Sequence, residues 1–73
     1  MLTAINREKN MPEIVIYAVE GRSTEQKHKL MKKITEAVVE SFEVEADRVM
    51  VSIVETKAIN KSRGGVPFSE RGK

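Results

Sequence analysis

The sequence contains no cysteine and a single histidine, His28, among its 73 residues. Without cysteine there can be no disulfide and no thiolate zinc site, and one histidine excludes a histidine-rich metal cage. A chain of this length usually buries too little apolar surface to be stable by itself, and it needs a disulfide, a metal or a partner subunit. Because disulfides and such metal sites are excluded and 40% of the residues are hydrophobic, we expect a single domain that self-associates.

The sequence also lacks a concentrated charge and a long hydrophobic run. Thirteen basic and eleven acidic residues are interspersed, with a net charge of +2, which differs from the basic stripe that binds a phosphate backbone. No stretch approaches the roughly 18 apolar residues that cross a bilayer, and residues 1–10 have no apolar core of a signal peptide. We therefore expect a cytoplasmic protein without nucleic-acid or membrane partners.

The first regular element is predicted at residues 13–19, EIVIYAV, which are mostly β-branched or aromatic. The run is apolar on both alternating faces, which is typical of a strand covered on both sides. Ser23 and Gln26 then have the S-x-x-Q spacing of a capping box, in which each side chain satisfies a backbone N–H of the other residue. This spacing predicts a helix that begins at about Thr24.

The rest of the helix and a second strand are predicted from hydrophobic spacing. Apolar residues recur at helical intervals from Leu30 to Phe42 and predict a core-facing side. A polar connection at residues 43–47 leads to a second strand at residues 48–55, RVMVSIVE. A strand, a long helix and a strand indicate an α+β fold built on a right-handed β-α-β crossover with two parallel strands.

One helix cannot cover both faces of such a sheet, so we expect the open face to contact another subunit. After Glu55 the sequence becomes polar, and Gly64 and Gly65 predict a turn or hairpin near the C-terminus.

Common catalytic constellations are missing from the sequence. His28 lies on the predicted wet side of the helix, and no serine or acid has a convincing histidine partner for a triad. Arg22 is more informative, because a cation just before a helix N-terminus is disfavoured by about 0.3 to 1 kcal/mol. With the free amides of the first turn it could bind a carboxylate in a bidentate manner. The alternative is an ordinary surface arginine.

Several motifs occur in one order along residues 12–73. Met11-Pro12 is followed by a strand, by EGRSTEQK at residues 20–27, by ITEAV within the helix, by a strand that ends in Val54-Glu55, and by the glycine pair. In this order the sequence resembles the 4-oxalocrotonate tautomerase family. The M-P start and the GRS-x-EQK block are the most specific elements of the resemblance.

The resemblance implies a cofactor-free isomerase that uses no metal and assembles as a homohexamer, a trimer of dimers. It implies that Pro12 is the catalytic base and that Arg22 holds the carboxylate of a small unsaturated 2-hydroxy or 2-oxo acid. An amino-terminal amine has a pKa of about 7.7 to 8. Partial burial and nearby cations lower that pKa, so that more of the amine is free base at neutral pH.

Two positions depart from the family pattern. The second arginine of the family's best-known members aligns with Met50, and their aromatic residue before the glycine pair aligns with Lys61. Lys61 or Arg63 could supply a replacement cation and Phe68 a replacement ring. The physiological substrate is therefore not assigned by the sequence.

Pro12 is internal in the sequence as written, and a tertiary amide nitrogen is not basic. Three hypotheses address residues 1–11. In the first, an incorrect start site adds a leader, and synthesis begins at Met11. In the second, the segment is removed after synthesis. In the third, it is a genuine part of a non-catalytic structural or regulatory homologue. We favour the first, with residues 12–73 as the tautomerase domain. A related proline-dependent hydratase or dehalogenase is a further alternative.

Overall fold

The computed structural model describes residues 11–71, so the expected leader lies outside the described residues except for Met11. Within this range β1 (Glu13–Val19) is followed by α2 (Thr24–Phe42) and β2 (Met50–Thr56), and a short hairpin follows, formed by β3 (Ser62–Arg63) and β4 (Val66–Pro67). Three 3₁₀ turns, Ala46–Arg48, Ala58–Asn60 and Phe68–Glu70, lie between and after these elements.

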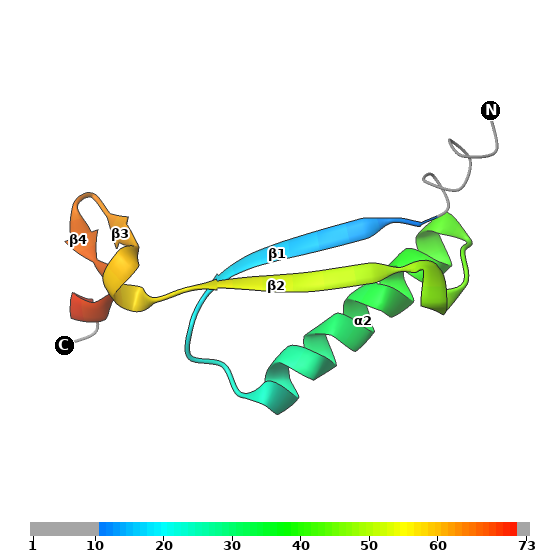
Figure 1. Cartoon of the computed structure of the whole chain (residues 1–73), viewed down its shortest axis with the longest axis horizontal. Helices are drawn as coiled ribbons and strands as arrows, with labels where there is room; N and C mark the ends of the chain where they lie inside the picture. Colours follow the sequence, from blue (N-terminus) through cyan, green and yellow to red (C-terminus); the bar gives the residue numbers. More distant parts are fainter. Residues whose placement is uncertain (1–10, 72–73) are drawn as a thin grey trace.

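The β-α-β crossover predicted from the sequence is confirmed. β1 and β2 pair in parallel from Glu13 opposite Met50 to Val19 opposite Thr56. α2 runs back along one face of this two-stranded sheet, from the ends of the strands to their beginnings (Figure 1). The C-terminal hairpin projects beyond the ends of the strands on the side away from Pro12 (Figure 1).

The capping box that was predicted to start the helix is present. The Gln26 N–H donates to Ser23 Oγ at 3.1 Å, and the Ser23 N–H donates to Gln26 Oε1 at 3.0 Å. The helix ends at Glu43, which adopts a left-handed conformation with φ of 57° and donates its N–H to the Val39 carbonyl at 2.9 Å. With Ser23 as its N-cap, the helix begins at Thr24, as predicted.

The second strand begins later than predicted, at Met50 instead of residue 48. Ala46–Arg48 form a 3₁₀ turn in which the Arg48 N–H donates to the Glu45 carbonyl at 3.0 Å. The Val49 N–H donates to the Ala46 carbonyl at 3.1 Å. Because these amides are used inside the turn, the ladder to β1 begins only with the Met50 N–H.

The side chains of one sheet face are partly covered by α2, and those of the other face are open. Ile14, Ile16 and Ala18 of β1 are half-buried, whereas Val15 and Tyr17 between them are 42% and 72% exposed. None of the residues from 11 to 71 is fully buried. The prediction of a strand covered on both sides is therefore met on one face only within a single chain.

The predicted apolar side of α2 is only partly covered by the sheet. Met31, Ile34 and Val38 are half-buried, but Leu30 is 41% and Phe42 62% exposed. The sheet is only two strands wide, so it leaves part of the apolar side of this 19-residue helix open. In the part of the chain that the structure describes, no helix is long and apolar enough to cross a membrane.

Candidate active site

Arg22 lies in the turn between β1 and α2, and one glycine conformation and two hydrogen bonds fix this turn. Gly21 has a φ of +127°, which residues with a side chain rarely adopt. The Glu20 N–H donates to the Thr56 carbonyl at 2.9 Å, and Glu20 Oε2 accepts from the Ala58 N–H at 3.1 Å. The turn that carries Arg22 is thus attached to the segment that follows β2.

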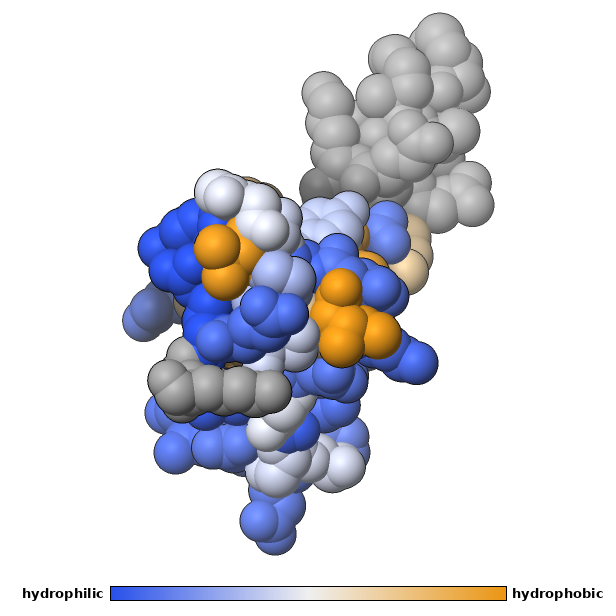
Figure 2. Space-filling model, turned by 90° about the vertical axis from the view of Figure 1, so that its left-hand side faces the viewer, coloured by the Kyte–Doolittle hydropathy of each residue, from blue (hydrophilic) through white to orange (hydrophobic). Residues whose placement is uncertain are grey.

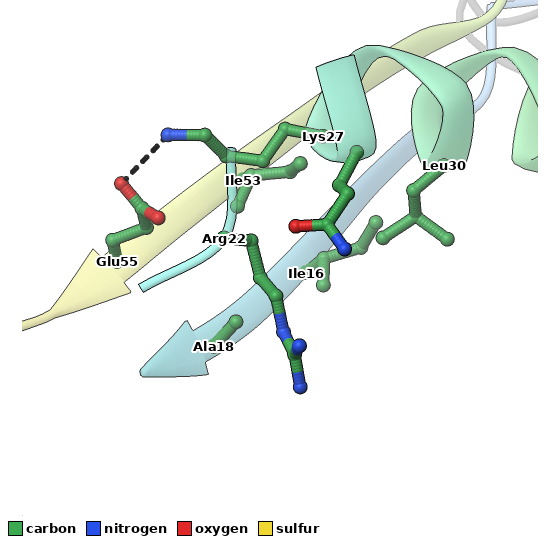
Figure 3. A pocket seen from close by; sticks show the side chains of 8 residues that line it. Ile16, Ala18, Arg22, Lys27, Leu30, Ile53 and Glu55 are labelled. Carbon is green, nitrogen blue, oxygen red and sulfur yellow. Dashed lines mark hydrogen bonds and ion pairs between the residues drawn. The ribbon is translucent and has the colours of Figure 1, made fainter. Parts of the chain in front are cut away.

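A groove with a volume of about 270 Å³ lies beside this turn, between the ends of the strands and the first turns of α2. Its floor is mostly aliphatic and its rim is charged. The lining residues are Ile16, Ala18, Arg22, Gln26, Lys27, Leu30, Ile53 and Glu55 (Figure 3).

The two cations of this groove have different environments. Lys27 Nζ forms an ion pair with Glu55 Oε1 at 3.1 Å, and both side chains are about one third exposed. The Arg22 side chain extends away from this pair (Figure 3). No ion pair with the Arg22 guanidinium is found among residues 11–71. Its donors are therefore available to an anion from outside the described chain.

The arrangement suits a small acid with an apolar body. An arginine can donate two parallel hydrogen bonds to a carboxylate, and the positive end of the α2 dipole lies at the same place. The aliphatic side chains of Ile16, Leu30 and Ile53 can contact the carbon skeleton. Among the described residues, no cluster of three or more histidine or acidic side chains could hold a metal ion.

Pro12 lies at the opposite end of β1. It is half-buried, and its carbonyl accepts the Met50 N–H at 2.9 Å. The 7 residues of β1, at about 3.3 Å each, separate Pro12 from Arg22 by about 20 Å. The structure therefore does not bring these two predicted site residues together within one chain.

The other residues predicted for the site lie either near Pro12 or on the hairpin side of the molecule. Met50 starts β2 beside Pro12 and is 47% exposed. Lys61 is half-buried and Arg63 exposed, and both belong to the hairpin side of the molecule. The Phe68 N–H donates to the Lys61 carbonyl at 2.7 Å, and the Arg71 guanidinium lies 5.8 Å from the centre of the Phe68 ring.

Sequence reasoning missed the two glutamates that organise the Arg22 end. Glu20 accepts a hydrogen bond from Ala58, and Glu55 pairs with Lys27. Both residues follow or end neighbouring parallel strands, whose carboxyl ends meet at one edge of a sheet. That shared position was the available signal, but a glutamate at a strand end is too common to be distinctive.

Sequence comparison identifies relatives of this chain. The family model described as a tautomerase enzyme matches residues 2–64. A probable tautomerase of Bradyrhizobium diazoefficiens is 44% identical over 84% of this chain and 91% of its own length. A 2-hydroxymuconate tautomerase of a Pseudomonas species is 37% identical over 82% of this chain and 95% of its own length.

The fold is also that of a solved relative. The structure of a heterohexamer 4-oxalocrotonate tautomerase from Chloroflexus aurantiacus superimposes with a TM-score of 0.76. It is 33% identical to this chain, and the match covers 84% of this chain and 98% of that one. Sequence and fold therefore agree along most of each molecule, and the chain belongs to the tautomerase family of isomerases.

Proposed function

We propose that this protein is a cofactor-free keto-enol tautomerase of small unsaturated 2-hydroxy or 2-oxo carboxylic acids. The observation that carries the proposal is the Arg22 guanidinium, which has no ion-pair partner within residues 11–71 and stands at the rim of an aliphatic groove. In this proposal Arg22 binds the substrate carboxylate and Pro12 is the general base. The relatives named as 2-hydroxymuconate tautomerases support this class of substrate.

The proposed chemistry is a proton transfer by a secondary amine. The free amine of Pro12 removes the proton of the enol hydroxyl, and the C–O bond becomes C=O. The resulting ammonium returns a proton to a carbon of the conjugated chain, where the C=C bond is lost. Positive charge from Arg22 favours the negative charge that develops on the conjugated oxygens.

This role requires Pro12 to be the first residue of the mature protein. We propose that synthesis begins at Met11 and that loss of this methionine exposes the amine. The mass of the intact protein from its native host tests this directly. A mass that corresponds to a start at Pro12 supports the enzyme proposal, and a mass that includes residues 1–11 contradicts it.

The geometry further supports a site shared between chains. A small acid is much shorter than the distance of about 20 Å between Pro12 and Arg22 of one chain. We propose that Pro12 of one chain acts with Arg22 of another, in a homohexamer built as a trimer of dimers. The exposed Val15, Tyr17 and Val54 side chains on the open sheet face and the heterohexameric relative support association of several chains. Lys61 and Arg63 would add positive charge around the carboxylate.

Two variants separate the proposed roles. With Pro12 confirmed as the first residue, we expect Pro12→Ala to reduce kcat for 2-hydroxymuconate or phenylenolpyruvate by about 10² to 10⁴, the range for loss of a general base. We expect Arg22→Ala to act mainly through KM, and Lys32→Ala, on the exposed side of α2, to leave both constants unchanged. An unchanged rate in Pro12→Ala would show that another group is the base.

A further inference from the structure

The two ends of the chain carry opposite charge. We define the Pro12 end as residues 12–13 and 42–50, and the Arg22 end as residues 19–27 and 55–71. The Pro12 end contains four acidic residues and one basic residue, and the Arg22 end contains four acidic and six basic residues. The net charges are therefore −3 and +2. Figure 2, which views the molecule from the Arg22 end, shows a mostly hydrophilic face with small hydrophobic patches.

Two structural features strengthen the negative character of the Pro12 end. The C-terminus of α2, the negative end of its dipole, lies there, and no basic residue occupies its last turn. Arg48, the one cation of this end within the described residues, has its Nε 3.9 Å from Glu45 Oε1. The carboxylate of Glu13, next to Pro12 in sequence, has no cationic partner among residues 11–71.

The same end exposes apolar side chains. Phe42 is 62% and Met50 47% exposed. Met50 is also held against Pro12, because its N–H donates to the Pro12 carbonyl at 2.9 Å and it pairs with Glu13 across the ladder. Within one chain, the surroundings of Pro12 therefore combine an apolar surface with a net negative charge. A carboxylate would be repelled there, whereas an alkyl or aryl group would find apolar contact.

We propose that the preferred substrates carry one carboxylate, bound at the Arg22 end of one chain, and an uncharged apolar group, which contacts Met50 beside Pro12. Met50 and Glu13 are then the residues that determine specificity between monocarboxylates and dicarboxylates. This inference rests on the proposed tautomerase function and on the site shared between chains. It goes beyond them by naming the class of acid.

The test compares two enols with the full enzyme, after intact mass has confirmed Pro12 as the first residue. Phenylenolpyruvate carries one carboxylate and a phenyl ring, and 2-hydroxymuconate carries two carboxylates. We expect kcat/KM to favour phenylenolpyruvate by about tenfold or more, since like-charge juxtaposition is costly. Met50→Arg is expected to reduce this ratio by about tenfold or more, and Met50→Leu to keep the preference.

A second pair of variants isolates charge from shape. Glu13→Gln removes a negative charge beside Pro12 and is expected to move the ratio toward the dicarboxylate by a few fold. Glu36→Gln makes the same change on an exposed turn in the middle of α2 and is expected to leave the ratio unchanged. The effect of Glu13→Gln should shrink at high salt, because salt screens exposed charges.

The outcomes distinguish this inference from the proposed function. Turnover of both enols with a preference for 2-hydroxymuconate, or a ratio unaffected by Met50→Arg, overturns the specificity assignment and leaves the tautomerase proposal intact. If neither enol reacts although Pro12 is confirmed at the N-terminus, both proposals are wrong.

Discussion

At the scale of single residues, Gly21 shapes the turn that carries Arg22. Its φ of +127° is strained for any residue with a Cβ, although a Cβ at this position would have no atom within 4 Å. The penalty of Gly21→Ala is therefore conformational, with no clash, and is expected to be about 1 to 3 kcal/mol. The chain can avoid this penalty by changing the turn that holds Arg22.

We predict that Gly21→Ala lowers the free energy of unfolding by this amount and raises KM for the carboxylate substrate more than it lowers kcat. Denaturant unfolding and steady-state kinetics measure the two effects. Lys32→Ala, on the exposed side of α2, is the control. A folded Gly21→Ala protein with unchanged KM would show that the turn does not position Arg22.

At the scale of elements, the start of α2 depends on two reciprocal hydrogen bonds between Ser23 and Gln26. Ser23→Ala removes the acceptor for the Gln26 N–H and is expected to destabilise the protein by about 1 kcal/mol per chain. Gln26→Glu keeps an acceptor for the Ser23 N–H and is expected to cost less. Thermal unfolding of both variants at equal concentration measures the difference, and equal Tm values would contradict the capping assignment.

The elements also show how far sequence reasoning reaches. The strand at residues 13–19 and the start of the helix follow from local patterns, so both were predictable. The later start of β2 was not, because hydrophobic alternation does not reveal that Arg48 uses its N–H in a turn with Glu45. The exposure of Phe42 was missed for another reason. Its apolar spacing shows that it needs a partner surface, but it does not show whether that surface belongs to the same chain.

The candidate site was also predictable only in part. Arg22 could be chosen from its place before the helix and from the family resemblance. Its separation from Pro12 follows from the length and direction of β1, which the sequence also contained. The ion pair of Lys27 with Glu55 depends on the crossover angle between helix and sheet, and no local pattern encodes that angle.

At the scale of the whole molecule, the chain exposes apolar surface that a second copy would cover. Tyr17 is 72% exposed and lies opposite Val54 of β2 in the ladder, and burial of such a side chain contributes about 1.5 to 3 kcal/mol. We predict that Tyr17→Asp dissociates the assembly, whereas Tyr17→Phe preserves it. Sedimentation equilibrium measures the mass of each variant.

A second measurement tests the same prediction. Association of folded chains makes Tm rise with protein concentration, and this dependence should be lost together with the assembly in Tyr17→Asp. An unchanged mass for Tyr17→Asp, with normal helix content by circular dichroism, would show that the open sheet face is not an interface.

The hydrogen bond from Met50 to Pro12 has a consequence for how activity could arise. The strand ladder uses the carbonyl oxygen of Pro12, and a proline nitrogen within a chain has no hydrogen to donate. Cleavage before Pro12 would therefore turn an inert amide into a base without breaking a bond of the ladder. A precursor and its processed form would share this hydrogen bond of the ladder and differ in the reactivity of the Pro12 nitrogen.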